Sequence, residues 1–415
     1  MIHLPAPRDN QWLFLDMNAF FASCEQHHDP SLSGKPIAVA PSLGPSACII
    51  AASYEAKAHG ITTGWRVGEA KQKLPELIVV PGNHRYYTDI HNRILSFLDA
   101  EVSPGVKTLS VDEFGIPLDT REQWTPNAHA LAIKVKEGIS DIFSPALMCS
   151  VGVAPNMFLA KVGTEIQKPN GLVVIQQHTI ESAFSQLALR EIPGINWGMS
   201  RRLNAIGIKT TVDFFRAPQD LLHNAFGITG DAWWYNLHGY NLQHTNGFRA
   251  SERPKSISHS HVLAPALRTK AKGRAVLYKL WIKVADRLRE KHLGTSRISI
   301  MARSHTDRWE HTLSLSPTQN VFDVFRHVAA AYDTELSDRF CPKQILVVCH
   351  SLTPHTPQPI SLFDTTSHKV IDLFEASKNL NHKFGRWTVK PASLLIAGDA
   401  APNRITFRKP DYEMD

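Results

Sequence analysis

Apolar and polar positions alternate along this chain in runs that predict short strands and amphipathic helices. Residues 11–17 form an apolar, strand-sized run that carries Asp16 near its end. Apolar residues recur at helical spacing in residues 86–100, which predicts a helix there. Further strands are expected at residues 36–40, 49–53, 78–80, 106–114, 147–153 and 172–175, and further helices at residues 19–27, 54–59, 65–74, 127–143 and 156–167.

The order of these elements predicts an α+β fold with several domains. Without an insert at about residues 28–80, the first part reads strand-helix-strand-helix-strand in a split βαβ order. Residues 180–245 contain short helical patterns separated by glycines. Residues 254–355 return to strands and helices, with amphipathic helices near 272–292 and 322–338.

The amino-acid composition indicates a globular protein and argues against several other classes. The chain has 415 residues, of which 43% are hydrophobic and 20% charged, so it is an ordinary globular sequence of about two to four domains. No apolar run approaches the roughly 18 residues of a membrane span, and we expect no signal peptide and no membrane partner. The five cysteines are scattered without a CxxC pair, which argues against disulfides and zinc fingers and favours a cytoplasmic location.

The basic charge is concentrated in one region. The net charge is +7, yet residues 249–308 contain 15 Lys and Arg against 4 Asp and Glu, a net of +11, so the remainder carries −4. Such a region suits a polyanion, but a solvated basic face would give the same pattern.

Three carboxylates form a candidate metal site. Asp16 lies near the end of one expected strand, and Asp112 and Glu113 lie on another, 96 residues later. Acids that converge at adjacent strand ends repel one another unless cations bind them, and two Mg²⁺ ions suit such oxygen ligands and phosphoryl transfer. A turn or a salt-bridged surface is the alternative.

Two other sequence features are candidate phosphate-binding sites. Lys161 and Lys168 precede a Pro-Asn-Gly turn at residues 169–171, and glycine turns at residues 193–195 and 206–208 frame a short helix. A lysine can hold a phosphate as a point charge, and exposed backbone N–H groups can contact phosphates without reading sequence. A plain helix stop and a plain helical hairpin remain the alternatives.

Six segments, in family order, resemble the motifs of the Y-family (translesion) DNA polymerases. They are residues 16–25, 53–57, 109–113, 150–171, 192–194 and 255–257. Asn18, the run at residues 22–25 and the tail at 368–389 are most similar to the catalytic subunit of DNA polymerase V, whereas residues 168–171 resemble DNA polymerase IV.

The resemblance implies a right-hand polymerase fold. Its parts would be a ferredoxin-like palm (residues 1–27 and 80–178), small fingers (28–79), a helical thumb with a helix-hairpin-helix (179–248), an α/β little finger (254–355) and a C-terminal tail with a clamp-binding motif (356–415). The implied activity is template-directed addition of dNTPs to a primer 3′-OH by two-metal phosphoryl transfer. Fidelity would be low and proofreading absent, with a role in DNA repair, damage tolerance and SOS mutagenesis.

The resemblance also implies roles for single residues. Asp16, Asp112 and Glu113 would be catalytic and would hold two Mg²⁺ ions together with the backbone carbonyl of Met17, and Mn²⁺ can substitute. Phe21 would be a steric gate that stacks on the sugar and excludes a 2′-OH. The residues implied in nucleotide binding are Phe20, Phe21, Ser53, Tyr54, Lys57 and Lys168.

The implied partners are primed DNA, dNTPs and the sliding clamp. The basic region would lie along the duplex backbone, and the residues implied in DNA binding are Gly194, Gly207, Lys255, Ser256 and Arg303. A peptide at 358–363 resembles a clamp-docking motif, with Gln358, Ile360, Leu362 and Phe363 as its contacts, although a surface loop would also fit. The subfamily resemblance adds an activating accessory subunit and a recombinase filament as candidate partners, at the bacterial nucleoid.

Three departures from the family pattern concern the site. Residues 114–117 read Phe-Gly-Ile-Pro where the family usually continues Ala-Tyr-Leu, Lys107 replaces a frequent acid, and Lys57 stands where arginine is frequent. They leave open a second hypothesis, a non-catalytic homologue that scaffolds a repair assembly on the clamp. The retention of all three acids favours the polymerase.

Overall fold

The structure, a computed structural model, describes most of the chain as two separate compact units. Outside the tail it describes residues 6–119, 121–123, 125–242, 254–318 and 321–354, and in the tail residues 373, 376–377, 379–381, 383–385 and 387–402. The boundary between the two units falls at residues 249 and 250. In the described parts, no helix is both long enough and apolar enough to cross a membrane.

A mixed five-stranded sheet organises the first unit. β1 (Trp12–Met17) lies at its centre and is antiparallel to both neighbours. The connection from β6 to β7 through α5 (Thr125–Ile142) passes across β1, so the predicted split βαβ order is confirmed. In spatial order the strands are β5 (Lys107–Thr108), β6 (Glu113–Pro117), β1, β7 (Cys149–Ala154) and β8 (Leu172–Val174).

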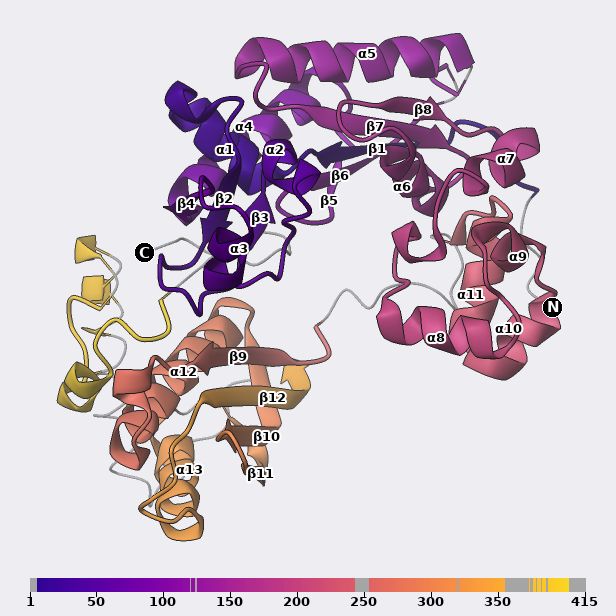
Figure 1. Cartoon of the computed structure of the whole chain (residues 1–415). Coiled ribbons are helices and arrows are strands. Elements are labelled where there is room, and N and C mark those ends of the chain that lie inside the picture. Colours follow the sequence, from indigo (N-terminus) through magenta and orange to yellow (C-terminus); the bar gives the residue numbers. More distant parts are fainter. Residues whose placement is uncertain are drawn as a thin grey trace. The chain divides into compact units, whose positions relative to one another are not determined.

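Alternate residues of β1 enter two different cores. Leu13, Leu15 and Met17 pack in one core with the helices α1 (Phe20–His28), α4 (His84–Glu101) and α5. Trp12 and Phe14 pack in the other core, against α6 (Met157–Ile166), and Figure 1 shows α5 and α6 on opposite sides of the sheet. By the same alternation, Asp16 belongs to the face that α6 covers.

The expected single strand at residues 106–114 is wrong. The chain makes β5, turns at residues 109–112 and returns as β6, so Asp112 lies in the turn and Gly115 and Pro117 lie inside a strand. A Cβ at Gly115 would come within 2.8 Å of the Met157 sulfur, so a larger residue there would require the Met157 side chain to move. The unusual segment after Glu113 is therefore accommodated in the sheet.

The insert forms a small sheet with its own core. β2 (Ile37–Ala40) lies between β3 (Ala51–Ala52) and β4 (Ile78–Pro81). β3 is shorter than the strand expected at residues 49–53, because Ser53 already begins a helix. The accompanying helices are η1 (Pro30–Leu32), α2 (Tyr54–Ala58) and α3 (Val67–Lys73).

A group of short helices shares the core beneath α6 and completes the first unit. Gly194 and Gly207, at φ of +88° each, make the turns on either side of α8. The elements are η2 (Gln177–Thr179), α7 (Ile180–Phe184), η3 (Leu189–Glu191), α8 (Trp197–Ala205), α9 (Thr211–Arg216), α10 (Gln219–Phe226) and α11 (Ile228–Leu237).

The second unit is a four-stranded antiparallel sheet covered by helices. Its strands, in spatial order, are β11 (Arg308–Thr318), β10 (Leu293–Arg303), β12 (Gln344–Pro354) and β9 (Ile257–Val262). α12 (Lys270–Glu290) and α13 (Val321–Glu335) share its core. The short η5 (Pro265–Leu267) precedes α12, and the tail adds η6 (Ala392–Ala397), whose Leu394 and Ala397 enter the same core.

Candidate active site

The sheet brings the three predicted acids to one end of β1. Asp16 pairs with Glu113 across β1 and β6. Asp112 directly precedes β6, and its carbonyl accepts a hydrogen bond of 2.9 Å from the N–H of Met17. The two segments that the sequence separates by 96 residues are thus joined by backbone hydrogen bonds.

Two glycines bring α6 close to this end of the sheet. A Cβ at Gly152, on β7, would lie 1.9 Å from the carbonyl oxygen of Ala160, and one at Gly163 would lie 3.3 Å from the Cα of Gly152. Helix and strand backbones therefore approach more closely than any side chain would allow. This approach places Lys161 on α6 and Lys168 just beyond it over the acids.

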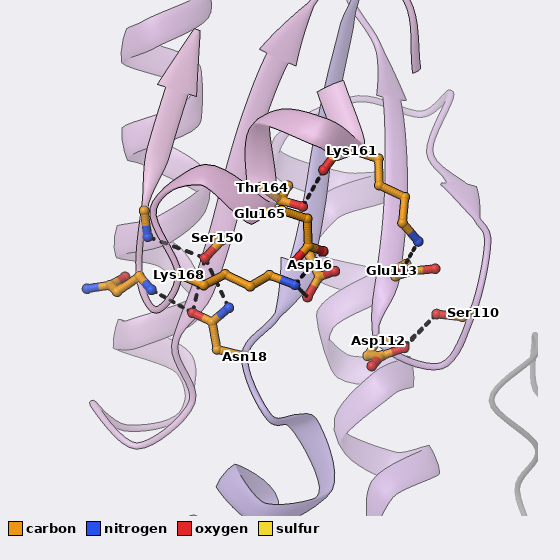
Figure 2. Close-up of polar contacts among 12 residues, drawn as sticks. Asp16, Asn18, Ser110, Asp112, Glu113, Ser150, Lys161, Thr164, Glu165 and Lys168 are labelled. Carbon is orange, nitrogen blue, oxygen red and sulfur yellow. Dashed lines mark hydrogen bonds and ion pairs between the residues drawn. The ribbon is translucent and has the colours of Figure 1, made fainter. Parts of the chain in front are cut away.

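Each acid has a polar partner (Figure 2). The ammonium of Lys161 pairs with Glu113. The ammonium of Lys168 lies 3.1 Å from Asp16 Oδ1 and 2.8 Å from Glu165 Oε1. Asp112 Oδ1 accepts a hydrogen bond of 2.6 Å from the hydroxyl of Ser110. The acids and lysines therefore form one partly buried charge network.

Burial disfavours the ionised forms of the acids in this network. Burial raises the pKa of Asp16 to about 7, and Asp112 adds to the increase while Lys168 opposes it. Burial and the neighbouring Glu113 also raise the pKa of Asp112, although the Ser110 hydroxyl opposes the shift. Burial lowers the pKa of Lys168, but Asp16 and Glu165 more than reverse this and raise it. Lys168 and the Ser110 hydroxyl therefore do not fully offset the cost of ionising Asp16 and Asp112.

Oxygen donors that gain from added positive charge suit a hard divalent cation. In the described residues, no three carboxylate, imidazole or thiol groups are arranged as a preformed metal site. The three acids are instead engaged with Lys161, Lys168 and Ser110. The donor set fits Mg²⁺ chemically, and binding requires these side chains to exchange partners.

Sequence reasoning missed the residues that hold Lys168 in place. The side-chain amide of Asn18 donates to the Ser150 hydroxyl (3.0 Å), and its oxygen accepts from the backbone N–H of Asn170 (2.6 Å). The ammonium of Lys136 donates to the Asn170 carbonyl (2.6 Å). These contacts anchor the turn that carries Lys168. The sequence feature that could have indicated these contacts is Asn18, a neutral residue that follows Asp16 and Met17 in the first motif.

Sequence reasoning also missed the support of the acid-bearing turn. His91, buried on α4, contacts the carbonyl of Val111 through Nδ1 at 2.7 Å, and its ring stacks on Phe114 at 5.1 Å. The turn that presents Asp112 is therefore tied to the helical layer behind it.

The predicted nucleotide-binding residues separate into two groups. Phe20 and Phe21 are buried, and the Phe21 ring stacks on Tyr87 at 4.6 Å. Ser53 is also buried, and its hydroxyl accepts from the backbone N–H groups of Ile37 and Ala56, so it holds the start of α2.

Tyr54 and Lys57 are half-buried beside the charge network. The Lys57 ammonium lies 4.3 Å from the centre of the Tyr54 ring. Burial, with Lys168 as the next cause, lowers the pKa of Lys57. The same burial raises the pKa of Tyr54, which Lys168 opposes. Both side chains are thus coupled to the lysine that faces Asp16.

Several cations of the basic region are engaged within the second unit, whereas the expected contact of the region with DNA stays a prediction. Lys279 and Lys283 are buried on α12 and donate to the carbonyls of Gly398 and Ala401 in the tail. Lys270 pairs with Asp338 and Arg274 with Asp333. These four side chains make hydrogen bonds and ion pairs within the second unit, because the tail and α13 pack against α12.

The predicted DNA contacts lie in both units. Gly194 and Gly207 form turns in the first unit, and Lys255, Ser256 and Arg303 are exposed in the second. Arg303 borders a hollow of about 360 Å³ at the β10–β11 hairpin. The clamp-motif residues Gln358, Ile360, Leu362 and Phe363 lie outside the described residues.

Two family models match the chain. Residues 15–165 match the impB/mucB/samB family, and residues 254–362 match the C-terminal domain of that family. Together the two matches cover more than half of the chain.

Relatives and solved structures agree with these matches. DNA polymerase IV of Bacillus velezensis is 28% identical over 410 residues, covering 96% of each chain. DNA polymerase IV 1 of Bacillus subtilis is 31% identical over 291 residues, covering 70% of this chain and 69% of its own. A Y-family DNA polymerase chimera of Dbh and Dpo4 superposes with a TM-score of 0.69 at 25% identity, over 83% of this chain and 99% of the chimera.

The fold and these relatives define a DNA-directed DNA polymerase. The chain belongs to the Y family of translesion DNA polymerases. The alternative of a non-catalytic scaffold is not supported, because these relatives are polymerases. The similarity to the polymerase V subfamily stays a prediction.

Proposed function

We propose that Asp16, Asp112 and Glu113, with the Met17 carbonyl, bind two Mg²⁺ ions and are the catalytic residues of nucleotide addition. The observation that carries this assignment is their convergence at one end of β1, beneath Lys161 and Lys168. Bound cations would supply the charge that activates a primer 3′-OH and neutralises a triphosphate. The raised pKa values of Asp16 and Asp112 support this assignment.

The chain's own residues would orient the incoming dNTP. Lys168 would exchange its contact with Asp16 for a phosphate oxygen, since an ammonium binds phosphate as a point charge. Tyr54 and Lys57 would contact the same triphosphate from α2. Ser53 would hold the start of that helix, as its hydrogen bonds to backbone N–H groups indicate.

Primer extension tests the assignment of the acids. The variant Asp112→Ala/Glu113→Ala should lose extension by at least about a thousandfold, the scale on which electrostatic stabilisation of a transition state acts, while it binds a primed duplex normally. Glu101→Ala, which removes an exposed acid on α4, is the matched control. Extension by the double variant would overturn the assignment.

Phe21 is proposed as the steric gate, with Phe20 as its packing support. Its ring is held by stacking on Tyr87, whose hydroxyl donates to Glu25. Phe21→Ala should raise ribonucleotide incorporation at least about tenfold relative to dNTP incorporation, a difference of about 1.4 kcal/mol. Single-nucleotide incorporation with matched rNTP and dNTP measures this ratio. An unchanged ratio would assign the gate elsewhere.

The DNA and clamp contacts complete the proposal. The glycine turns at Gly194 and Gly207, with the exposed Lys255, Ser256 and Arg303, would contact primed DNA through its phosphates, and binding would weaken with salt. Gln358, Ile360, Leu362 and Phe363 would dock on the sliding clamp. An accessory subunit and a recombinase filament are further candidate partners at the bacterial nucleoid.

A further inference from the structure

Trp197, at the start of α8, is a large aromatic side chain that the fold leaves in solvent. It is 66% exposed, whereas Trp12, Trp233 and Trp281 are buried. It follows the turn at Gly194 by three residues. An exposed indole on an ordered turn is available to a partner.

A cation is already placed on this indole. The guanidinium of Arg190, on η3, lies 4.5 Å from the centre of the Trp197 ring. Both side chains are exposed, and no ion pair of Arg190 occurs in the described part of the chain. A guanidinium over an exposed indole makes a weakly favourable electrostatic contact with the face of the ring. The contact therefore orders the two side chains without burying them.

The backbone beneath the pair is firmly anchored. Ile192 and Ile195 are buried between the two residues, and Leu203 buries the far side of α8. Asn196 caps α8 by accepting a hydrogen bond of 2.9 Å from the N–H of Met199. The indole and the guanidinium thus project from a scaffold that need not rearrange when a partner binds.

We propose that Trp197 and Arg190 together contact the sugar–phosphate backbone of the primed duplex. The indole would pack on a deoxyribose, and the guanidinium would donate to the adjacent phosphate. An apolar ring that carries a cation matches the alternation of sugar and phosphate along a strand, in both shape and charge. This inference rests on the proposed function and extends its DNA contacts from the glycine turns to two named side chains.

Equilibrium binding of the full chain to a fluorescein-labelled primer–template duplex tests the pair. Trp197→Ala should weaken binding about threefold to tenfold, whereas Trp197→Phe, which retains an aromatic ring, should recover most of the affinity. Arg190→Ala should weaken binding and reduce the slope of log Kd against log salt by about 1, because one phosphate contact is lost. Trp197→Ala should leave that slope unchanged.

Two controls separate contact from folding. Ile228→Ala removes an exposed apolar side chain from α11 in the same unit and should bind as the unsubstituted chain does. Since both side chains of the pair are exposed, Trp197→Ala should unfold at nearly the same temperature as the unsubstituted chain. Binding of the duplex should quench part of the tryptophan fluorescence of the unsubstituted chain. This quenched component should be absent from Trp197→Phe.

Normal duplex affinity and salt slope in both Trp197→Ala and Arg190→Ala would overturn the inference, and would indicate a different partner for this surface. The polymerase assignment would stand in that case, provided that extension still depends on Asp112 and Glu113. An unsubstituted chain that neither binds nor extends the primed duplex would instead overturn the proposed function.

Discussion

At the end of β1, burial and neighbouring acids raise the free-energy cost of ionising a single carboxylate. Asp16 is 8% exposed and has three further acids as neighbours, Asp112, Glu113 and Glu165, so its carboxylate ionises in the folded chain only at a cost. Lys168 reduces that cost without removing it. The proposed binding of divalent cations at this site would offset the remaining cost.

This cost predicts a pH-dependent stability in the absence of divalent cations. The pKa of Asp16 lies at about 7 in the folded chain against an ordinary 3.8, so folding is weakened as pH rises through this window and the loss is complete above it. Asp16→Asn stays neutral. We expect it to exceed the unsubstituted chain by about 4 kcal/mol at pH 8 in EDTA and to match it near pH 4.

Thermal unfolding at the two pH values measures this difference. Adding Mg²⁺ at pH 8 should raise the unfolding temperature of the unsubstituted chain more than that of Asp16→Asn. Equal stability of the two proteins at pH 8 would contradict the assigned cost of ionising Asp16.

At the scale of elements, the site depends on how closely α6 approaches β7. The approach is possible because Gly152 has no Cβ, and it determines which carboxylate each lysine of α6 and its following turn can reach. The turn beyond α6 is in turn held by Asn18 and Lys136. Elements far apart in sequence thus share one charge network.

Gly152→Ala should therefore damage both stability and activity. The new methyl group would lie 1.9 Å from the Ala160 carbonyl, so α6 must move away from the sheet. We expect a loss of about 2 kcal/mol in the free energy of unfolding, and extension should fall because Lys161 and Lys168 move with the helix. Gly44→Ala is the control, since its nearest atom would be 3.9 Å away. Unchanged urea unfolding of Gly152→Ala would show that this approach is not required.

At the scale of the whole molecule, the described end of the tail, residues 387–402, belongs to the second unit. Leu394, Ala397, Ala400 and Ala401 enter its core, although the matching family model ends at residue 362. The buried Lys279 and Lys283 donate to tail carbonyls. This layer explains why Lys279 and Lys283 of α12 are buried.

Adjacent leucines of η6 allow a matched test of this layer. Leu394 is 2% exposed and Leu395 is 65% exposed. Leu394→Asp should destabilise the second unit by about 3 kcal/mol or more, because it buries a carboxylate and removes apolar packing. Leu395→Asp should change stability by less than about 0.5 kcal/mol. Differential scanning calorimetry of the full chain compares the two, and equal effects would mean that the tail is not seated on α12.

The α+β order, the split βαβ order and the two segments that carry the acids can be predicted from the amino-acid sequence alone, because alternation and motif spacing are local properties. The sequence did not determine that Asp112 lies in a turn, that Asn18 supports Lys168, or that Lys279 and Lys283 face the tail. Those outcomes depend on distances between residues far apart in the chain. Burial and charge pairing follow from such distances, and only the tertiary structure sets them.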